Sequence, residues 1–205
     1  LTYGFMNSNP VDAKYREQAI EFQSRSESLA DITKRLASIP LLCQPGSQWN
    51  YSVATDVLGR LVEVLSGMSL AAFLQQRIFA PLKMVDTGFS VPEQTQHRFA
   101  SLYAPKVGGD MSSVGGAATP VPQDERGGLV LQEGSTQSVY FEAPGSHSGG
   151  GGLVGTIGDY ARFCQMLINE GELDGERILA PSTLRYMRTN QLPDNSDMAG
   201  MGQPV

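Results

Sequence analysis

The residues best suited to chemistry lie in a short aromatic run, Trp49-Asn50-Tyr51-Ser52-Val53. The run follows a turn-forming stretch, residues 43–48, and precedes an apolar helical pattern, so we expect Tyr51 where a loop becomes a helix. A phenol is a poor base because its pKa is about 10, but a neighbouring lysine ammonium favours the phenolate. Lowering that pKa by about three units takes roughly 4 kcal/mol. Tyr51 is therefore a candidate proton-transfer residue whose partners have to be identified.

Two helical patterns precede this run. The first opens at Pro10 and is expected to continue through Phe22. The second begins with Ser28 and Asp31, a hydroxyl at the N-cap and a carboxylate three residues later, which is a capping pattern. We expect this second helix to continue until Pro40 stops it.

Two further helices are expected after Tyr51. The first ends at Ser66-Gly67 and carries an apolar stripe of helical period: Ala54, Val57, Leu58, Leu61, Val62 and Leu65. Ser69 can cap the second, which Pro81 ends and whose inner face is Leu70, Phe73, Leu74 and Ile78. We interpret both stripes as faces of the hydrophobic core.

The middle of the chain, residues 90–148, is rich in Gly, Ser, Pro and Gln. Two short alternating runs within it, at residues 128–132 and 138–142, predict the strands of a hairpin. The rest is a long surface excursion, and such loops are usually functional or disordered. A lid or cleft wall and a plain mobile loop are both consistent with this composition.

An ordered block is expected from residue 149 onward. The glycine run 149–152 permits a close backbone approach or a strained turn, and no Gly-Lys-Ser/Thr follows it to hold phosphate. Residues 156–159, Thr-Ile-Gly-Asp, form a capping box for a helix that Gly171 closes. Residues 173–176 predict a tight turn, and Pro181 opens a last helix.

Composition excludes several functions. A net charge of −6 argues against nucleic acid and anionic membranes as partners. No apolar run approaches the roughly 20 residues of a membrane span. No metal or other cofactor is predicted, and His97 and His147 are interpreted as loop histidines. Cys43 and Cys164 lie far apart among apolar neighbours and are expected to be buried free thiols.

Several stretches, taken in order, resemble the serine β-lactamase-like superfamily. Within it they are most similar to esterases related to class C β-lactamases, the family VIII carboxylesterases. The stretches are residues 1–5 (Leu-Thr-Tyr-Gly-Phe), 45–59, 81–89 (Pro-Leu-Lys-Met-Val-Asp-Thr-Gly-Phe) and 149–153 running into 159–163. The resemblance implies an α+β fold, mostly helical here, in which helices stack on an antiparallel sheet and a helical region lies across the cleft.

The resemblance also implies a role for Tyr51. These enzymes use a Ser-x-x-Lys serine as nucleophile, with the lysine and a tyrosine sharing the proton transfer and backbone amides forming the oxyanion hole. Tyr51 matches that tyrosine, but Val53 stands where β-lactamases and peptidoglycan enzymes usually carry an asparagine that holds the substrate amide. Valine at this position favours esters, and short-chain carboxylic esters are the expected substrates. A β-lactamase or D-alanyl-D-alanine carboxypeptidase remains an alternative, as does a non-catalytic homologue that binds peptidoglycan or a protein.

No Ser-x-x-Lys occurs in the chain. The superfamily places that motif before the stretch that matches Leu1, so we expect an interior fragment, inactive alone, that lacks the nucleophile region and the C-terminal sheet strands. We expect one partial domain, residues 1–205, made of a helical region (1–89), a variable region (90–148) and a sheet-packing helix, turn and last helix (149–205). Apolar faces at residues 160–187 would then be exposed. His147-Ser148-Gly149 is rejected as the third family motif because it precedes the 159–171 helix.

Overall fold

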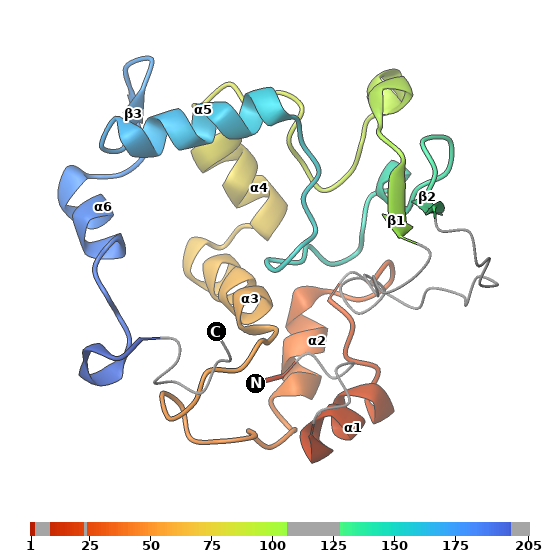
Figure 1. The fold of residues 1–205 in the computed structure, drawn as a ribbon, viewed down its shortest axis with the longest axis vertical. Helices are drawn as coiled ribbons and strands as arrows, with labels where there is room; N and C mark the ends of the chain where they lie inside the picture. Colours follow the sequence, from red (N-terminus) through yellow and green to blue (C-terminus); the bar gives the residue numbers. More distant parts are fainter. Residues whose placement is uncertain (3–8, 23, 106–127, 198–205) are drawn as a thin grey trace. The chain divides into compact units, whose positions relative to one another are not determined.

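The computed structural model describes residues 1–2, 9–22, 24–105 and 128–197. Residues 3–5, part of the first stretch of the family resemblance, lie outside these ranges. The chain forms two compact units, one of residues 1–89 with 144–205 and the other of residues 90–143. Figure 1 traces the elements of both units along the chain.

The first helix, α1 (Pro10–Glu17), is shorter than the sequence suggests. Asn9 caps it, since its side-chain oxygen accepts hydrogen bonds from the backbone N–H groups of Val11 and Asp12. The expectation that it continues through Phe22 is wrong, because Ala19 has a φ of 47°, outside the helical region.

The second helix, α2 (Leu29–Leu36), begins as predicted. The Ser28 hydroxyl accepts a hydrogen bond from the Asp31 N–H at 3.2 Å and donates one to the Asp31 carboxylate at 2.6 Å. The helix ends at Leu36, earlier than predicted, and Ser38 and Ile39 continue in tighter turns, with hydrogen bonds to the carbonyls three residues before them.

The third helix, α3 (Ala54–Ser66), directly follows the Tyr51 run and ends at Gly67, which has a φ of 70°. Ser69 caps α4 (Leu70–Leu74) as predicted, and α4 continues as a π-helical turn, η1 (Gln75–Phe79). Helices α3 and α4 are visible in Figure 1 as consecutive segments with a sharp change of direction between them.

The predicted core face of α3 is partly wrong. The fully buried positions of the helix are Asp56 and Gly59, while Leu58, Leu61 and Leu65 are 56%, 47% and 78% exposed. The helix turns its small and acidic residues inward because the glycine run packs against that side, as described below. Its apolar stripe therefore lies largely at the surface of the described chain.

The C-terminal part of the first unit begins with α5 (Ile157–Ile168), which Thr156 caps as predicted. A two-residue hairpin follows, β3 (Glu172–Leu173) paired antiparallel with β4 (Glu176–Arg177). Its tight turn is confirmed, since Asp174 and Gly175 both have positive φ. The last helix, α6 (Pro181–Met187), also opens at the predicted proline.

Two hydrophobic clusters form the core of the first unit. One joins α1, α2 and the start of α3 and α4, with buried members Val11, Tyr15, Phe22, Leu29, Ile32, Leu36, Ile39, Val53, Leu70 and Phe89. The other joins η1, the residues that follow it and α5, with buried members Phe79, Leu82, Met84 and Met166. The exposed apolar residues expected near 160–187 are also present, at Tyr160, Ile168, Tyr186 and Met187.

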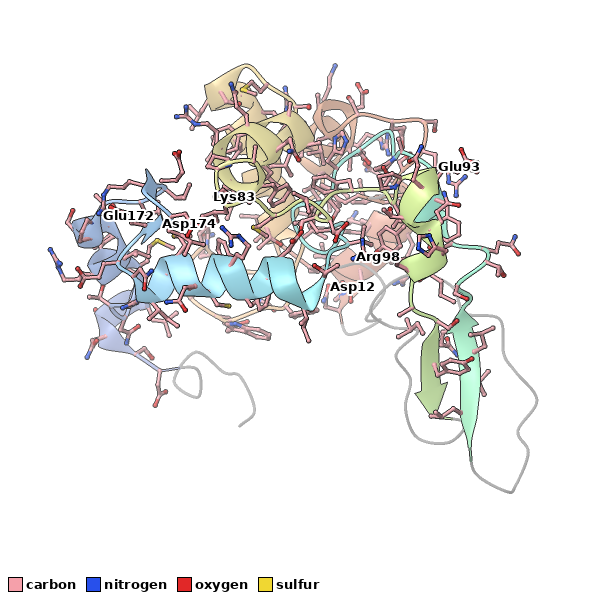
Figure 2. The ribbon with its side chains drawn as sticks, turned by 90° about the horizontal axis from the view of Figure 1, so that it is seen from above. Asp12, Lys83, Glu93, Arg98, Glu172 and Asp174 are labelled. Atoms are coloured by element: carbon pink, nitrogen blue, oxygen red, sulfur yellow. The ribbon has the colours of Figure 1, made fainter. Side chains whose placement is uncertain are left out.

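The second unit pairs two strands, and not the two that the sequence suggests. Strand β1 (Leu102–Pro105) runs antiparallel to β2 (Leu129–Glu133), as the paired arrows in Figure 2 show. The predicted partner at residues 138–142 instead contains a short 3-10 helix, η4 (Val139–Phe141). Ser138 caps that turn by accepting the N–H of Tyr140, which commits the segment to a turn instead of a ladder.

Aromatic side chains hold this second unit together. The 3-10 helix η2 (Glu93–Arg98) leads into Phe99, whose ring lies 5.3 Å from that of Phe141 in an edge-to-face arrangement. The Val91 N–H donates to the Tyr140 carbonyl at 2.7 Å. Backbone pairing and aromatic packing therefore join the two ends of the unit.

No single helix within the described residues has the length and hydropathy of a membrane span. Helix α3 and the segment Leu70–Phe79 have that length and hydropathy only when they are counted together, and the chain bends by 77° between them.

Candidate functional site

Tyr51 lies in the loop before α3, as the sequence predicts, and its side chain is 49% exposed. Its ring is stacked with that of Trp49, with 6.1 Å between the ring centroids and 29° between the planes. The loop is tied to itself, since Ser52 accepts the Ala54 N–H and Asn50 donates its side-chain N–H to the Cys43 sulfur at 3.4 Å. The phenol is thus accessible on a loop with defined contacts.

A first anchor follows Tyr51 directly. Val53 is 4% exposed, and its N–H donates to the Thr2 carbonyl at 3.3 Å. Thr2 is itself buried, and its N–H donates to the Tyr15 hydroxyl at 3.2 Å. Burial raises the pKa of Tyr15, and the hydrogen bond from Thr2 opposes part of that rise. Tyr15 is therefore a buried structural phenol, whereas the Tyr51 side chain is exposed.

A second anchor lies in the first turn of α3. Asp56 is 2% exposed and accepts a hydrogen bond from the Ser148 hydroxyl at 2.5 Å and another from the Gly150 N–H at 3.2 Å. The Ser148 oxygen in turn accepts the N–H groups of Gly150 and Gly151. The buried carboxylate is thus satisfied by donors far away in the sequence, which join the helix after Tyr51 to the glycine run.

The glycine run permits this contact. A Cβ on Gly149 would lie 2.4 Å from the Thr55 carbonyl oxygen, and one on Gly150 would lie 2.7 Å from the Asp56 carboxylate. No Cβ fits 2.4 Å from a backbone oxygen, so glycine is required at position 149 for the two backbones to approach, whereas a Cβ at position 150 would displace the Asp56 side chain. The close backbone approach expected for residues 149–152 is confirmed at Gly149.

The 81–89 stretch is held against α5 by a parallel set of contacts. Asp159, also buried, accepts the Asp86 N–H and the Thr87 hydroxyl, each at 2.8 Å. Backbone hydrogen bonds link Gly88 and Val154 in both directions, at 3.0 and 2.8 Å. These contacts fix the segment that leads out of the first unit.

A network of ion pairs links the 81–89 stretch and α5 to the turn between β3 and β4. Arg162 donates to the Leu82 carbonyl and to the Asp174 carboxylate, each at 2.5 Å. The Lys83 ammonium lies 3.4 Å from the same carboxylate, and Figure 2 shows Lys83 and Asp174 as neighbours. The hydrogen bond from Arg162 is the main cause that lowers the pKa of Asp174. The network is exposed and distant in sequence from Tyr51, so we interpret it as structural.

His147 lies beside the second anchor. Its ring packs edge-on against Phe89, with 4.8 Å between the centroids, and it is half-buried. Burial lowers the pKa of His147, and the negative charge of Glu63 opposes that shift. The imidazole is a partly buried loop residue next to Ser148, whose hydroxyl is committed to Asp56.

Other titratable groups offer no metal site in the described part of the chain, where no group of three His, Cys, Asp or Glu side chains could hold a metal ion. Cys43 and Cys164 are free thiols, but the expectation that they are buried is wrong because both are only partly covered. Cys164 shares a helical row with the exposed Tyr160 and Ile168, which explains its exposure.

The contact between Asp56 and Ser148 was not predicted from the sequence. A signal for Asp56 was present, since a carboxylate among the apolar positions of a core helix must find partners if it is buried. Ser148 had a weaker signal, a hydroxyl directly before four glycines. The pairing of the two depends on the fold and could not be found from either residue alone.

These features define a class of protein. The chain belongs to the Beta-lactamase family, whose model matches residues 1–204. This confirms the resemblance to the serine β-lactamase-like superfamily on which the interpretation of Tyr51 depends.

Individual relatives agree with that assignment. The chain is 34% identical over 195 residues to Protein Rv1367c of Mycobacterium tuberculosis (strain ATCC 25618 / H37Rv), covering 95% of this chain and 42% of that protein. It is 36% identical over 143 residues to Esterase EstB of Burkholderia gladioli, covering 70% and 35%. Among solved structures, EstCE1, described as a hydrolase with promiscuous acyltransferase activity, has a TM-score of 0.67 at 27% identity, covering 93% of this chain and 47% of that chain. The chain thus spans less than half the length of these relatives.

Proposed function

We propose that the protein containing this chain is a carboxylesterase that hydrolyses short-chain esters through a serine acyl-enzyme, with Tyr51 transferring the proton. The observation that carries the proposal is the exposed phenol of Tyr51 at the start of α3, in a chain of the Beta-lactamase family. Two relatives, EstB and EstCE1, are described as an esterase and a hydrolase.

The proposed reaction has two steps. In the first, the serine of a Ser-x-x-Lys motif elsewhere in the polypeptide attacks the ester carbonyl and loses its proton to Tyr51, with the lysine of that motif sharing the proton transfer. The bond between the carbonyl carbon and the alcohol oxygen then breaks, and Tyr51 returns the proton to the alcohol. In the second step water gives a proton to Tyr51 and attacks the acyl carbonyl. The bond between the carbonyl carbon and the serine oxygen then breaks, Tyr51 returns the proton to the serine oxygen, and the carboxylic acid is released.

Val53 supports esters over amides as substrates. Its side chain is apolar and buried in the core cluster, so the third position of the tyrosine motif presents no hydrogen-bonding group. A site that binds a substrate N–H needs a matching acceptor, and a buried valine cannot supply one. An ester lacks that N–H and loses nothing at this position.

The test is the turnover of p-nitrophenyl butyrate by the intact protein and by its Tyr51→Phe variant. Loss of the proton-transfer group should lower kcat about 10²- to 10⁴-fold. Tyr186→Phe is the matched control, because Tyr186 is 67% exposed on α6, outside the anchored loop. Turnover by Tyr51→Phe within a factor of two of the parent would refute the assigned role.

Two outcomes would favour the alternatives. If nitrocefin or a D-alanyl-D-alanine peptide were hydrolysed faster than the ester, the protein would be a β-lactamase or carboxypeptidase of the same family. If the complete reading frame held no Ser-x-x-Lys, the protein would be a binding homologue, and Tyr51 would have only a packing role.

A further inference from the structure

The chain has one tryptophan, Trp49, and it does not lie in the core. Among the described residues, neither Trp49 nor Tyr51 belongs to the two buried hydrophobic clusters or to the side chains packed against them. Trp49 is partly covered and Tyr51 is 49% exposed, so part of this aromatic pair remains accessible to a ligand.

The position of that indole is tied to the proposed proton transfer. Its ring is stacked with Tyr51, 6.1 Å away between centroids, and lies on the loop that precedes the anchored residue Val53. The two rings therefore form one aromatic surface with the Tyr51 hydroxyl as its polar group. Such a surface suits a flat apolar group that carries an oxygen at one end.

The direction of the proton decides which part of an ester meets this surface. When the acyl-enzyme forms, the carbon–oxygen bond to the alcohol breaks and the alcohol oxygen receives its proton from Tyr51. That oxygen must come within about 2.6–3.2 Å of the phenol oxygen. The group attached to the same oxygen is then the part of the substrate placed next to the aromatic surface.

We propose that Trp49, together with the ring of Tyr51, forms the subsite for the alcohol portion of the ester and selects aromatic alcohols. This inference rests on the proposed function, since it uses the proton transfer by Tyr51. Trp49 is a specificity-determining residue here, and it has no part in the acyl-enzyme once the alcohol has left.

The test compares esters in pairs, using the intact protein. Acetyl esters of methanol, benzyl alcohol and 2-naphthylmethanol vary the alcohol alone, while benzyl acetate, butyrate and hexanoate vary the acyl group alone. Each pair competes in one reaction, so the ratio of kcat/KM values does not depend on how much of a variant is folded. The variants are Trp49→Ala and Trp49→Phe, with Tyr186→Ala as the exposed-aromatic control.

We expect Trp49→Ala to lower the preference for the benzyl and naphthylmethyl esters over the methyl ester about tenfold. Trp49→Phe should keep most of that preference, and neither variant should change the order of the three acyl groups. A Trp49→Ala enzyme that retained the parent's alcohol preference, or changed only its acyl preference, would overturn the inference while leaving the esterase in place. If the parent hydrolysed none of the esters, the proposed function would fail, and the inference with it.

Discussion

The buried contact between Asp56 and residues 148–150 gives a prediction for stability. Asp56→Ala removes the acceptor of two hydrogen bonds, from the Ser148 hydroxyl at 2.5 Å and the Gly150 N–H at 3.2 Å. A hydrogen bond to a charged group contributes about 1.5–3 kcal/mol, and the two share one oxygen, so we expect a loss of about 3–5 kcal/mol. For a chain of this size the midpoint of thermal unfolding should fall by on the order of 10 °C.

Isosteric variants separate the charge from the shape. Asp56→Asn keeps an acceptor but loses the charge, and its loss should lie between zero and that of Asp56→Ala. Asp194→Asn, at an exposed position, is the control and should change the midpoint by less than about 1 °C. In a double-mutant cycle with Ser148→Ala, a coupling energy near zero would refute the reasoning, because residues in direct contact should couple by about 0.5–3 kcal/mol.

Two further effects concern the same segment. Gly149→Ala should lower the free energy of urea unfolding by about 1–3 kcal/mol or more, because its Cβ would lie 2.4 Å from the Thr55 carbonyl oxygen. Gly151→Ala is the control and should lower it far less, since its Cβ meets nothing within 4 Å. Equal losses in the two variants would contradict this reasoning. His147 binds its proton less readily in the folded state than in the unfolded state, because burial lowers its pKa despite the opposing charge of Glu63. Its contribution to stability should be fully present above about pH 6.5 and lost as the pH falls through the folded pKa. The unfolding free energy of His147→Gln should therefore depend less on pH across that window, and an unchanged pH dependence would argue against the shift.

Local signals in the sequence predicted most helix starts. Ser28, Ser69 and Thr156 each accept the N–H three residues later, as the capping patterns indicate. Such signals are reliable because the cap and its partner are neighbours in the sequence. The ends were less predictable: α1 stops early at a left-handed Ala19, a residue that seldom adopts this conformation.

Non-local partners could not be predicted in the same way. The alternation in β2 is visible in the sequence, but its partner is β1 and not residues 138–142, because pairing depends on which edges meet in space. The buried side of α3 is a similar case. Its periodicity indicates Leu58 and Leu61 as core, yet Asp56 and Gly59 are inside because the glycine run packs there.

The stretches on which the family resemblance depends are also those that contact one another. Thr2 holds Val53, Ser148 and Gly150 hold Asp56, and Asp159 holds the 86–87 turn. Each contact joins segments far apart in the sequence.

Substitutions at and beside the candidate site should therefore affect stability and activity independently. The residues after Tyr51 are fixed by Thr2 and by the Asp56 contact, while the phenol itself is 49% exposed. Tyr51→Phe should leave the unfolding free energy within about 0.5 kcal/mol of the parent, as for an exposed substitution, yet lower ester turnover by orders of magnitude. Asp56→Asn should lower the unfolding free energy but leave ester turnover unchanged at temperatures below its unfolding midpoint. A Tyr51→Phe variant whose lost turnover followed a lost stability would show that the phenol acts by packing and does not transfer a proton.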